Sequence, residues 1–539
     1  MRISALALCL CLAAPVGAQD HQHADSGQLG NVSFATSCSA AAQPDFAHAM
    51  ALLHSFEFVP AREAFNAAVQ KDGTCAIAVW GVALTHWANP FAAGIKPAGQ
   101  LQAGKAAIDR AAGIGARTER ERDYIGAAAR LFEHYDTVDQ RTRMAAYRDA
   151  MQKVAASHPT DPEASAFYAL ALAAAADPTD KTYADLLKAG AILEKLWAAQ
   201  PMHPGLAHYI IHSYDVPALA PRAVEAARRY GKIAPAAPHA LHMPSHTFTR
   251  LGYWQESIET NILSAEAAHK SGNTGEELHA SDYEMYAYLQ TAQDAAAKRI
   301  LDALPGIARG FDPAVPGSAA SGAAGSFAIA AIPARYALER GAWREAAALD
   351  VRTTRAPYAD AMTWFARAVG AARSKDAALV GDGQKAIDQL KGLSERLAQA
   401  GEAYWAEQVA IQQLGASAWL ALAQGRPDEA LSLMREAVAR EGKTEKSAVT
   451  PGPLAPAHEM LGDMLLELKQ PREALEEFKK TMAKEPNRFR ALAGAAAAAT
   501  ALNDTAAARG FREQLLKICE RAETPGRPEL AAARQAVRR

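Results

Sequence analysis

A recurring pattern of small and large apolar residues restricts most of this chain to stacked helical hairpins. Its clearest example spans residues 455–485, with key positions at Leu461, Gly462, Leu465, Ala474, Phe478 and the following Pro486. These spacings place the residues on the facing sides of two short helices. Small residues let the two helices approach, large residues fill the space between them, and the proline ends the unit. Such a hairpin cannot bury its apolar side alone, so the pattern predicts an array of hairpins.

Further copies of the pattern occur along the chain, at Ala61–Phe65 with Ala68, Trp80-Gly81, Gly252–Ser257, Gly341–Ala346 and Gly425–Ala430. Together these segments resemble the tetratricopeptide repeat family over most of residues 42–520. The resemblance implies an all-α solenoid of helical hairpins wound into a right-handed superhelix. It also implies that the first helix of each hairpin lines a concave groove.

Length and composition agree with a repeat array divided into two blocks. The 539 residues exceed what one core accommodates. Abundant alanine and the scarcity of alternating β-branched residues favour helix throughout. A stretch rich in Gly, Pro, Ser and Ala at 303–325 predicts a linker between blocks at 42–302 and 326–520. The polar ends, 19–41 and 521–539, are expected to be flexible and to fray.

The N-terminus has the layout of a secretory signal peptide over residues 1–18. Arg2 precedes an apolar run from Ile3 to Ala14, and small residues end at Ala18. We therefore expect an exported protein, periplasmic or secreted. No later apolar run is long enough to predict a membrane span. A net charge of −2, from 57 basic and 59 acidic residues, argues against a general nucleic-acid binder.

Three cysteines remain once Cys9 and Cys11 leave with the signal peptide: Cys38, Cys75 and Cys519. Cys38 and Cys75 flank one predicted helical hairpin. In an oxidising compartment these two can form a disulfide. The alternative is that both are small buried residues.

Histidines concentrate between His203 and Trp254, which hold six of the sixteen in the chain. His208 and His212 are four residues apart, and a second set follows at three and then four residues, at His239, His242 and His246. Side chains at these spacings lie above one another on one helix face. Each of the two helices therefore presents a stripe of imidazoles.

The repeat length indicates which side of the solenoid these histidines face. If Ala223 and Ser257 are equivalent, the units begin at Pro204 and Pro238, 34 residues apart, which is one tetratricopeptide unit. The family's ligand-contacting positions then imply a set of groove-facing residues: His208, His212, His239, His242, His246 and Asp215. A next unit starting near Glu276 would place Glu284 beside His246.

Clustered imidazoles of this kind suit a transition-metal ion. Neutral imidazole is a ligand for Zn, Cu and Fe, and four histidines with a carboxylate satisfy four- or five-coordinate geometry. A bound cation also keeps crowded histidines neutral. The expected ligands are His208, His212, His242 and His246, with His239 nearby and Glu284 or Asp215 as acid, base or extra ligand. His54 and His86 are also expected to face the groove, but they would join the metal site only if the superhelix curled back.

A single histidine near a helix is more often a hydrogen-bonded packing residue than a ligand. We apply that interpretation to His203, His269, His279 and His458. Two functions remain open: a metal-binding exported solenoid, either a metal handler or a metal-dependent enzyme, and a scaffold whose groove binds peptides or proteins. The HExxH motif of zinc proteases is absent after His458, and the GxSxG motif of hydrolases is absent at 317–322, so no reaction is predicted.

Overall fold

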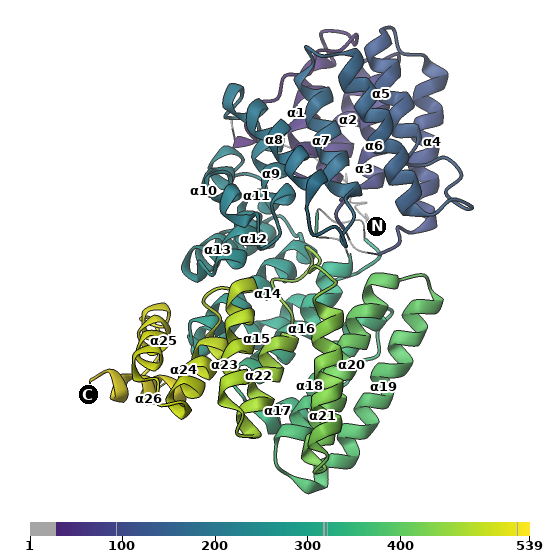
Figure 1. The fold of residues 1–539 in the computed structure, drawn as a ribbon. Coiled ribbons are helices and arrows are strands. Elements are labelled where there is room, and N and C mark those ends of the chain that lie inside the picture. Colours follow the sequence, from purple (N-terminus) through teal and green to yellow (C-terminus); the bar gives the residue numbers. More distant parts are fainter. Residues whose placement is uncertain (1–27, 93, 316–318, 321, 525, 539) are drawn as a thin grey trace, which may run out of the picture.

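The computed structural model describes residues 28–92, 94–315, 319–320, 322–524 and 526–538. Across these ranges the regular structure is helical, without a β-strand. Successive helices pack as antiparallel hairpins, which confirms the predicted all-α solenoid (Figure 1). The signal peptide predicted at 1–18 lies outside the described residues.

The first part of the array is the upper part of Figure 1, and one apolar core runs through it from Leu29 to Phe248. Its helices are α1 (Gln43–His54), α2 (Phe58–Lys71), α3 (Ala76–Trp87), α4 (Ala98–Ile114), α5 (Glu119–Ala129), α6 (Gln140–Ser157), α7 (Pro162–Ala175), α8 (Ala184–Ala199), α9 (Pro204–Ser213), the short η2 (Ala220–Ala223), α10 (Val224–Ile233), α11 (Pro238–His242), α12 (Pro244–Leu251) and α13 (Trp254–Lys270).

The second part is the lower part of Figure 1, and its largest core runs from Ala320 to Ala498. Its helices are α14 (Thr274–Gln290), α15 (Asp294–Ala308), α16 (Gly322–Glu339), α17 (Trp343–Ala347), α18 (Pro357–Arg373), the short η3 (Ala377–Leu379), α19 (Val380–Gln399), α20 (Ala403–Ala423), α21 (Pro427–Glu441), α22 (Ala457–Glu467), α23 (Pro471–Lys484), α24 (Phe489–Ala501), α25 (Thr505–Ile518) and α26 (Pro528–Val537).

Neighbouring helices pack closely where a glycine on one helix contacts an aromatic ring on the next. A Cβ added to Gly81 on α3 would lie 2.4 Å from the Phe65 ring on α2. A Cβ added to Gly462 on α22 would lie 2.8 Å from the Phe478 ring on α23. Both rings are fully buried. The small residue of the repeat is therefore a steric requirement of the hairpin.

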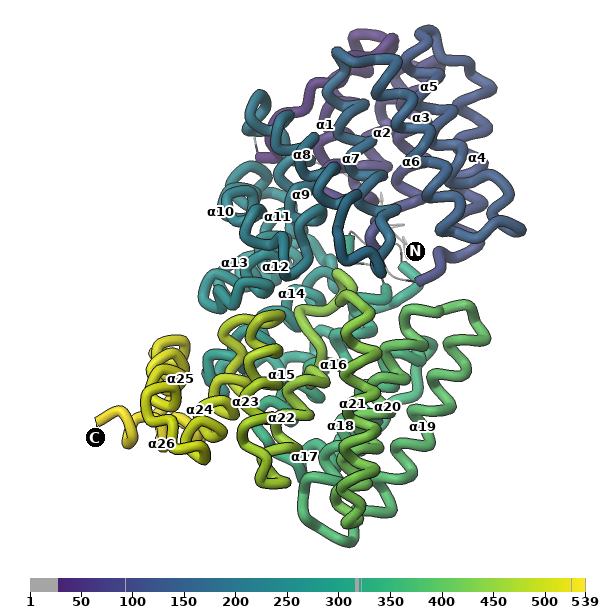
Figure 2. Tube along the Cα trace, in the orientation of Figure 1, coloured from purple at the N-terminus to yellow at the C-terminus, as the bar shows by residue number. Residues whose placement is uncertain are grey.

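The first part of the array curls until its start meets its later helices. The end of α1 packs against α9, although the two lie far apart in the sequence (Figure 2). This return places His54 next to the histidine-rich hairpins. His208 Nδ1 lies 2.7 Å from the backbone carbonyl oxygen of His54.

The segments before α1 and after α25 are more ordered than expected. Leu29 and Phe34 are buried in the first core, so residues 28–41 are held by packing without forming a helix. The tail forms α26, and Leu530 on this helix is fully buried. Just before α26, Arg527 pairs with Asp294 at 2.6 Å. The expected fraying is therefore wrong for residues 528–537, because burial and this ion pair hold α26 in place.

The region predicted as a linker, 303–325, contains helical residues at both ends. α15 continues to Ala308, and α16 begins at Gly322. Between them, the backbone carbonyl oxygen of Ala319 accepts a hydrogen bond from Asn89 Nδ2 at 3.1 Å. The segment therefore contacts the first part of the array.

Cys38 and Cys75 form a disulfide, with their Cα atoms 4.9 Å apart. This settles the alternative that the sequence left open. The bridge joins the segment before α1 to the start of α3. The remaining described cysteine, Cys519, is a buried thiol.

Among the described residues, none of the helices combines the length and apolar character that crossing a bilayer requires.

Substituting Gly81 with alanine tests the role of the close glycine contact. The added Cβ must displace the buried Phe65 ring, so we expect Gly81→Ala to lower the free energy of unfolding by about 1–3 kcal/mol. Gly126 is a matched control, because it lies inside α5 with no heavy atom within 4 Å of its added Cβ. We expect Gly126→Ala to raise stability by about 0.5–1 kcal/mol. Urea unfolding measures both, and equal effects would contradict the packing argument.

Candidate metal centre

Two hairpins one repeat apart carry the histidine stripes. α9 begins at Pro204 and α11 begins at Pro238, as the spacing predicts. Proline suits the first position of a helix, because its missing N–H would have no partner there. His208 and His242, at matching places in the two units, are both fully buried.

The first group of imidazoles is His208, His212 and His239, which we call the first triad. One ring nitrogen from each lies within 4.8 Å of the others. The Nε2 atoms of all three rings are buried and have no hydrogen-bond partner among the described residues. Each ring of the first triad thus has one buried nitrogen without a protein partner.

Hydrogen bonds to the opposite nitrogens fix how two rings of the first triad are oriented. His208 Nδ1 donates to the backbone carbonyl oxygen of His54 at 2.7 Å, and His239 Nδ1 donates to a carboxylate oxygen of Glu276 at 3.1 Å. Carbonyl and carboxylate oxygens only accept hydrogen bonds, so the proton of each neutral ring lies on Nδ1. Each Nε2 therefore presents a lone pair. Metal-binding histidines show this same arrangement.

The second group is His242, His246 and His279, which we call the second triad. One ring nitrogen from each again lies within 4.8 Å of the others. His242 Nδ1 donates to Asn261 Oδ1 at 2.7 Å, and His246 Nδ1 donates to Asp215 Oδ2 at 3.0 Å. The Asn261 amide nitrogen donates to the Ser257 carbonyl at 2.6 Å, which turns its oxygen towards His242. Both Nε2 atoms are again left without a proton.

The Nε2 atoms of His242 and His246 face one another at 3.1 Å. With the ring protons on Nδ1, two lone pairs meet at hydrogen-bond distance, which is repulsive unless a cation lies between them. Two nitrogens about 2.0–2.1 Å from one ion are about 3.1 Å apart when they subtend about 95–100°. The observed separation suits two ligands of a single metal ion.

Burial keeps the imidazoles neutral. Desolvation lowers the pKa of His208, His212 and His242 well below the usual value, and also lowers the pKa of His246. The same cause lowers the pKa of His279 to about 3. Neutral imidazole is the form that binds a metal ion. These five imidazoles are therefore in their ligand form at neutral pH.

Asp215 is an orienting residue in this structure. It was expected to be a ligand, an acid or a base, but its two oxygens are taken by His246 and by Arg250, the latter at 2.8 Å. Burial alone would raise the pKa of Asp215, but Lys446 and Arg250 hold it well below its usual range. Asp215 is therefore a carboxylate that fixes the His246 ring.

Glu284 does not join the histidines. Its carboxyl group interacts with Tyr288 and with Arg299 on α15, and burial raises its pKa to about 7. The residues of α14 that reach the cluster are Glu276, which bonds to His239, and His279. The expectation for Glu284 was wrong by one residue: Glu284 lies 38 residues after His246, whereas the stripe on α14 is offset by 37, so Tyr283 takes the matching place beside His246.

A signal in the sequence marks the correct register. His239, His242 and His246 are separated by three and four residues, and Glu276, His279 and Tyr283 repeat that spacing. The offset between the two stripes is 37 residues, from His239 to Glu276. His279 therefore belongs to the cluster, although as a single histidine it was interpreted as a packing residue. The four expected ligands are divided between the triads and do not meet at one point.

A third group, His54, Glu163 and His203, shows what a satisfied histidine looks like. His54 Nε2 donates to Glu163 at 3.0 Å, and His54 Nδ1 accepts from the Tyr209 hydroxyl at 2.9 Å. His203 Nε2 donates to the other Glu163 oxygen at 2.8 Å. Both nitrogens of His54 are used, so this ring serves packing between α1 and α9, whereas His203 Nδ1 has no partner among the described residues. His86 joins none of the three groups.

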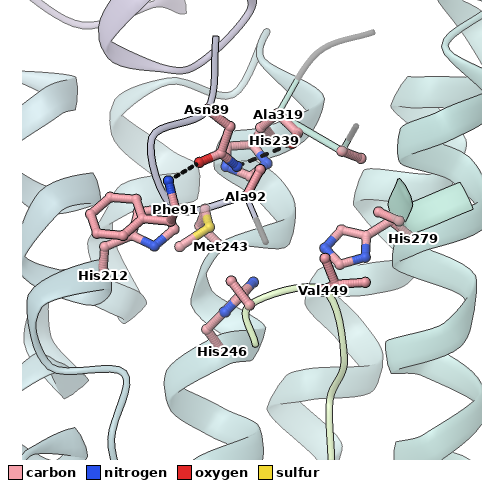
Figure 3. Close-up of a pocket in the computed structure, with 13 residues that line it drawn as sticks. Asn89, Phe91, Ala92, His212, His239, Met243, His246, His279, Ala319 and Val449 are labelled. Atoms are coloured by element: carbon pink, nitrogen blue, oxygen red, sulfur yellow. Dashed lines mark hydrogen bonds between the residues drawn. The ribbon is translucent and has the colours of Figure 1, made fainter. Parts of the chain in front are cut away.

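A small pocket opens beside both triads. Figure 3 shows His212 and His239 of the first triad and His246 and His279 of the second around it, with Phe91 against His212. The Phe91 and His212 rings are stacked, with centroids 4.1 Å apart. The pocket has room for a small molecule next to the imidazoles.

A loop from the second part of the array closes one side of this pocket. Val449, in the loop between α21 and α22, lines the pocket. The Tyr283 hydroxyl donates to the carbonyls of Ala448 and Thr450 at 3.0 and 3.1 Å, and Arg335 donates to Thr450 Oγ1 at 2.8 Å. Both parts of the chain therefore build the site.

Comparison with known proteins adds little to this geometry. No family model matches the chain, and no curated protein matches it. A structure of the human IFIT1 dimer with m7Gppp-AAAA is similar at 11% identity and a TM-score of 0.37, covering 89% of this chain and 96% of that one. A monomeric IFIT1 mutant with Gppp-AAAA gives 12% identity, the same TM-score and the same coverage. These distant likenesses carry no argument about ligands.

Acid should destabilise the metal-free protein through these histidines. Their pKa values are lowered from 6.5 in the folded state, so the unfolded chain binds protons that the folded chain does not. The contribution of these histidines to the free energy of unfolding is therefore fully present above about pH 6.5. It is lost as the pH falls, by up to about 1.4 kcal/mol per pH unit for each histidine. Urea unfolding of the metal-free protein between about pH 6.5 and pH 5 measures this slope.

The variant His279→Gln is the control for this prediction. It keeps a buried polar side chain but removes one titrating group, so its slope should fall by about 1.4 kcal/mol per pH unit. A slope unchanged from the parent protein would contradict the assignment of acid sensitivity to the cluster.

Proposed function

We propose that this protein is an exported helical-repeat protein that binds a transition-metal ion, zinc, copper or iron, through its buried histidines. The observation that carries the proposal is the first triad, where one ring nitrogen of each of three buried histidines lies within 4.8 Å of the others and no Nε2 has a protein partner among the described residues. Nε2 of His208 and Nε2 of His239 present lone pairs, because the ring protons lie on Nδ1. Three clustered imidazoles are the donor set of a three-histidine metal site.

Packing alone does not account for this arrangement. A buried polar atom without a hydrogen-bond partner lowers the free energy of unfolding by about 1–3 kcal/mol. The first triad contains three such atoms. His54 shows that this fold can satisfy both nitrogens of a buried imidazole when the ring serves packing. A metal ion would satisfy all three Nε2 atoms at once.

The donor set narrows the choice of metal and the kind of site. Each triad offers imidazole nitrogen alone, which suits zinc, copper and iron and disfavours calcium or magnesium. Three protein ligands leave a coordination position open, as in catalytic zinc sites, whereas structural sites are closed by four. The pocket beside His212 and His246 offers room for a small molecule at that position. This favours metal-dependent chemistry over storage.

Export would expose the protein to the metals it binds. The signal-like segment 1–18 and the disulfide between Cys38 and Cys75 support this part of the proposal, because disulfides persist in oxidising compartments. We expect the mature protein to be recovered outside the cytoplasm with Gln19 at its N-terminus. N-terminal sequencing checks this, and an intact leader on cytoplasmic protein would contradict it.

The second candidate, a peptide- or protein-binding scaffold, is favoured by a separate pocket of about 630 Å³ in the second part of the array. Phe327, Tyr358 and Trp405 line it, and the rings of Tyr358 and Trp405 stack at 4.5 Å. An aromatic pocket of this size suits an apolar side chain of a partner. It does not use the histidines, so binding there would be unaffected by their substitution.

Removing one ligand from each triad tests the metal proposal. We expect the parent protein, purified without an affinity tag, to contain near-stoichiometric transition metal. The double variant His208→Ala with His246→Ala should lose metal affinity by more than about 100-fold. Mutating a residue that only hydrogen-bonds to a metal ligand already lowers metal affinity by about 10–100-fold. Elemental analysis measures metal content, and circular dichroism checks that the helices persist.

His269 provides the matched control, because its side chain is 76% exposed on α13 and lies outside both triads. His269→Ala should retain the parent's metal content. If the double variant, still folded, kept as much metal as His269→Ala, the proposed site would be wrong.

A further inference from the structure

We propose that the histidine cluster holds two metal ions side by side, one in each triad, with a small ligand bridging them from the pocket. This inference rests on the proposed function and adds the number of ions, their arrangement and the class of ligand. Each ion would have three imidazole ligands. The bridging ligand would be a small anion such as hydroxide.

A single ion cannot use all six imidazoles. Ligand nitrogens lie about 2.1 Å from their metal, so any two of them are at most about 4.2 Å apart. The six rings fall into two separate groups at a limit of 4.8 Å and do not form one group. The cluster therefore has one point of convergence in each triad.

The two triads are close enough for their ions to be neighbours. Ring centroids are 6.0 Å apart both between His212 and His246 and between His239 and His242, and each of these pairs spans the two triads. Within the second triad, the centroids of His246 and His279 are 6.3 Å apart. Rings that belong to different triads are thus no farther apart than two rings of the same triad. Ions in two-metal sites are typically about 3.5–4 Å apart.

Carboxylates next to the ligand rings offset the charge of two ions. Asp215 bonds to His246 in the second triad, and Glu276 bonds to His239 in the first. Each triad therefore has one acidic partner that raises the basicity of a ligand ring. Because all six ligands are neutral imidazoles, a bridging anion would further reduce the repulsion between the ions.

The pocket gives that bridging ligand access to both ions. His212 and His239 come to the pocket from the first triad, and His246 and His279 come from the second (Figure 3). The remaining walls are largely small or apolar, including Ala92, Ala320, Ala324, Phe91 and Met243. A space bounded in this way fits a small anion or a diatomic molecule and excludes a large charged substrate.

Copper(II) provides a direct test, because two bridged copper(II) ions couple their spins and lose their paramagnetic resonance signal. The metal-free full-length protein is titrated with Cu(II), and bound copper is compared with the integrated signal. We expect two copper ions per chain and a signal well below two spins. His208→Ala and, separately, His279→Gln should each bind one ion per chain with a full one-spin signal. His269→Ala should behave as the parent does.

Other outcomes separate this inference from the proposed function. One copper ion per parent chain, or two ions with a full two-spin signal, would overturn the bridged pair while leaving metal binding intact. Loss of both ions in each single variant would also overturn it, because the triads would then not bind independently. No copper bound to the folded parent would overturn both the pair and the proposed function.

Discussion

Burying an imidazole favours a partner for each of its ring nitrogens, and this constraint shapes the centre of the molecule. At His54 the protein meets it fully, with Glu163 on one side and Tyr209 on the other. In the triads the protein supplies a partner for Nδ1 of His208, His239, His242 and His246, but the described residues supply none for Nε2 of the first-triad rings or for Nδ1 of His279. The His208 ring bonds to a backbone carbonyl and the His242 ring to an amide, so their Nε2 atoms are left for a partner that is not protein. A metal ion is the partner whose chemistry fits.

The repeat architecture brings these nitrogens together. Because α9 and α11 begin one repeat apart, their histidine stripes lie on neighbouring helices. α14 then adds a third stripe through Glu276 and His279. The curl of the first part returns α1 to α9, and a loop from the second part reaches the pocket at Val449. A solenoid thus encloses a polar cluster that no single hairpin could bury.

The sequence predicted the helices, the prolines at which two of them begin, and five of the six clustered histidines. These features depend on local spacing, which the chain carries directly. It did not predict the division into triads, because that depends on the depth of burial and on hydrogen-bond partners such as Asn261. Glu284 was placed wrongly because it lies 38 residues after His246, whereas the offset between the two stripes is 37, and His279 was missed because it was interpreted as a single packing histidine.

The central claim is that Nε2 atoms of the first triad converge on a metal ion. The most direct measurement is anomalous X-ray diffraction from crystals of the native protein, purified without a metal-chelating tag and recorded on both sides of the metal absorption edge. We expect an anomalous peak about 2.0–2.2 Å from Nε2 of His208, His212 and His239. Three rings bonded only to ordered water, with no anomalous peak beside them, would contradict it.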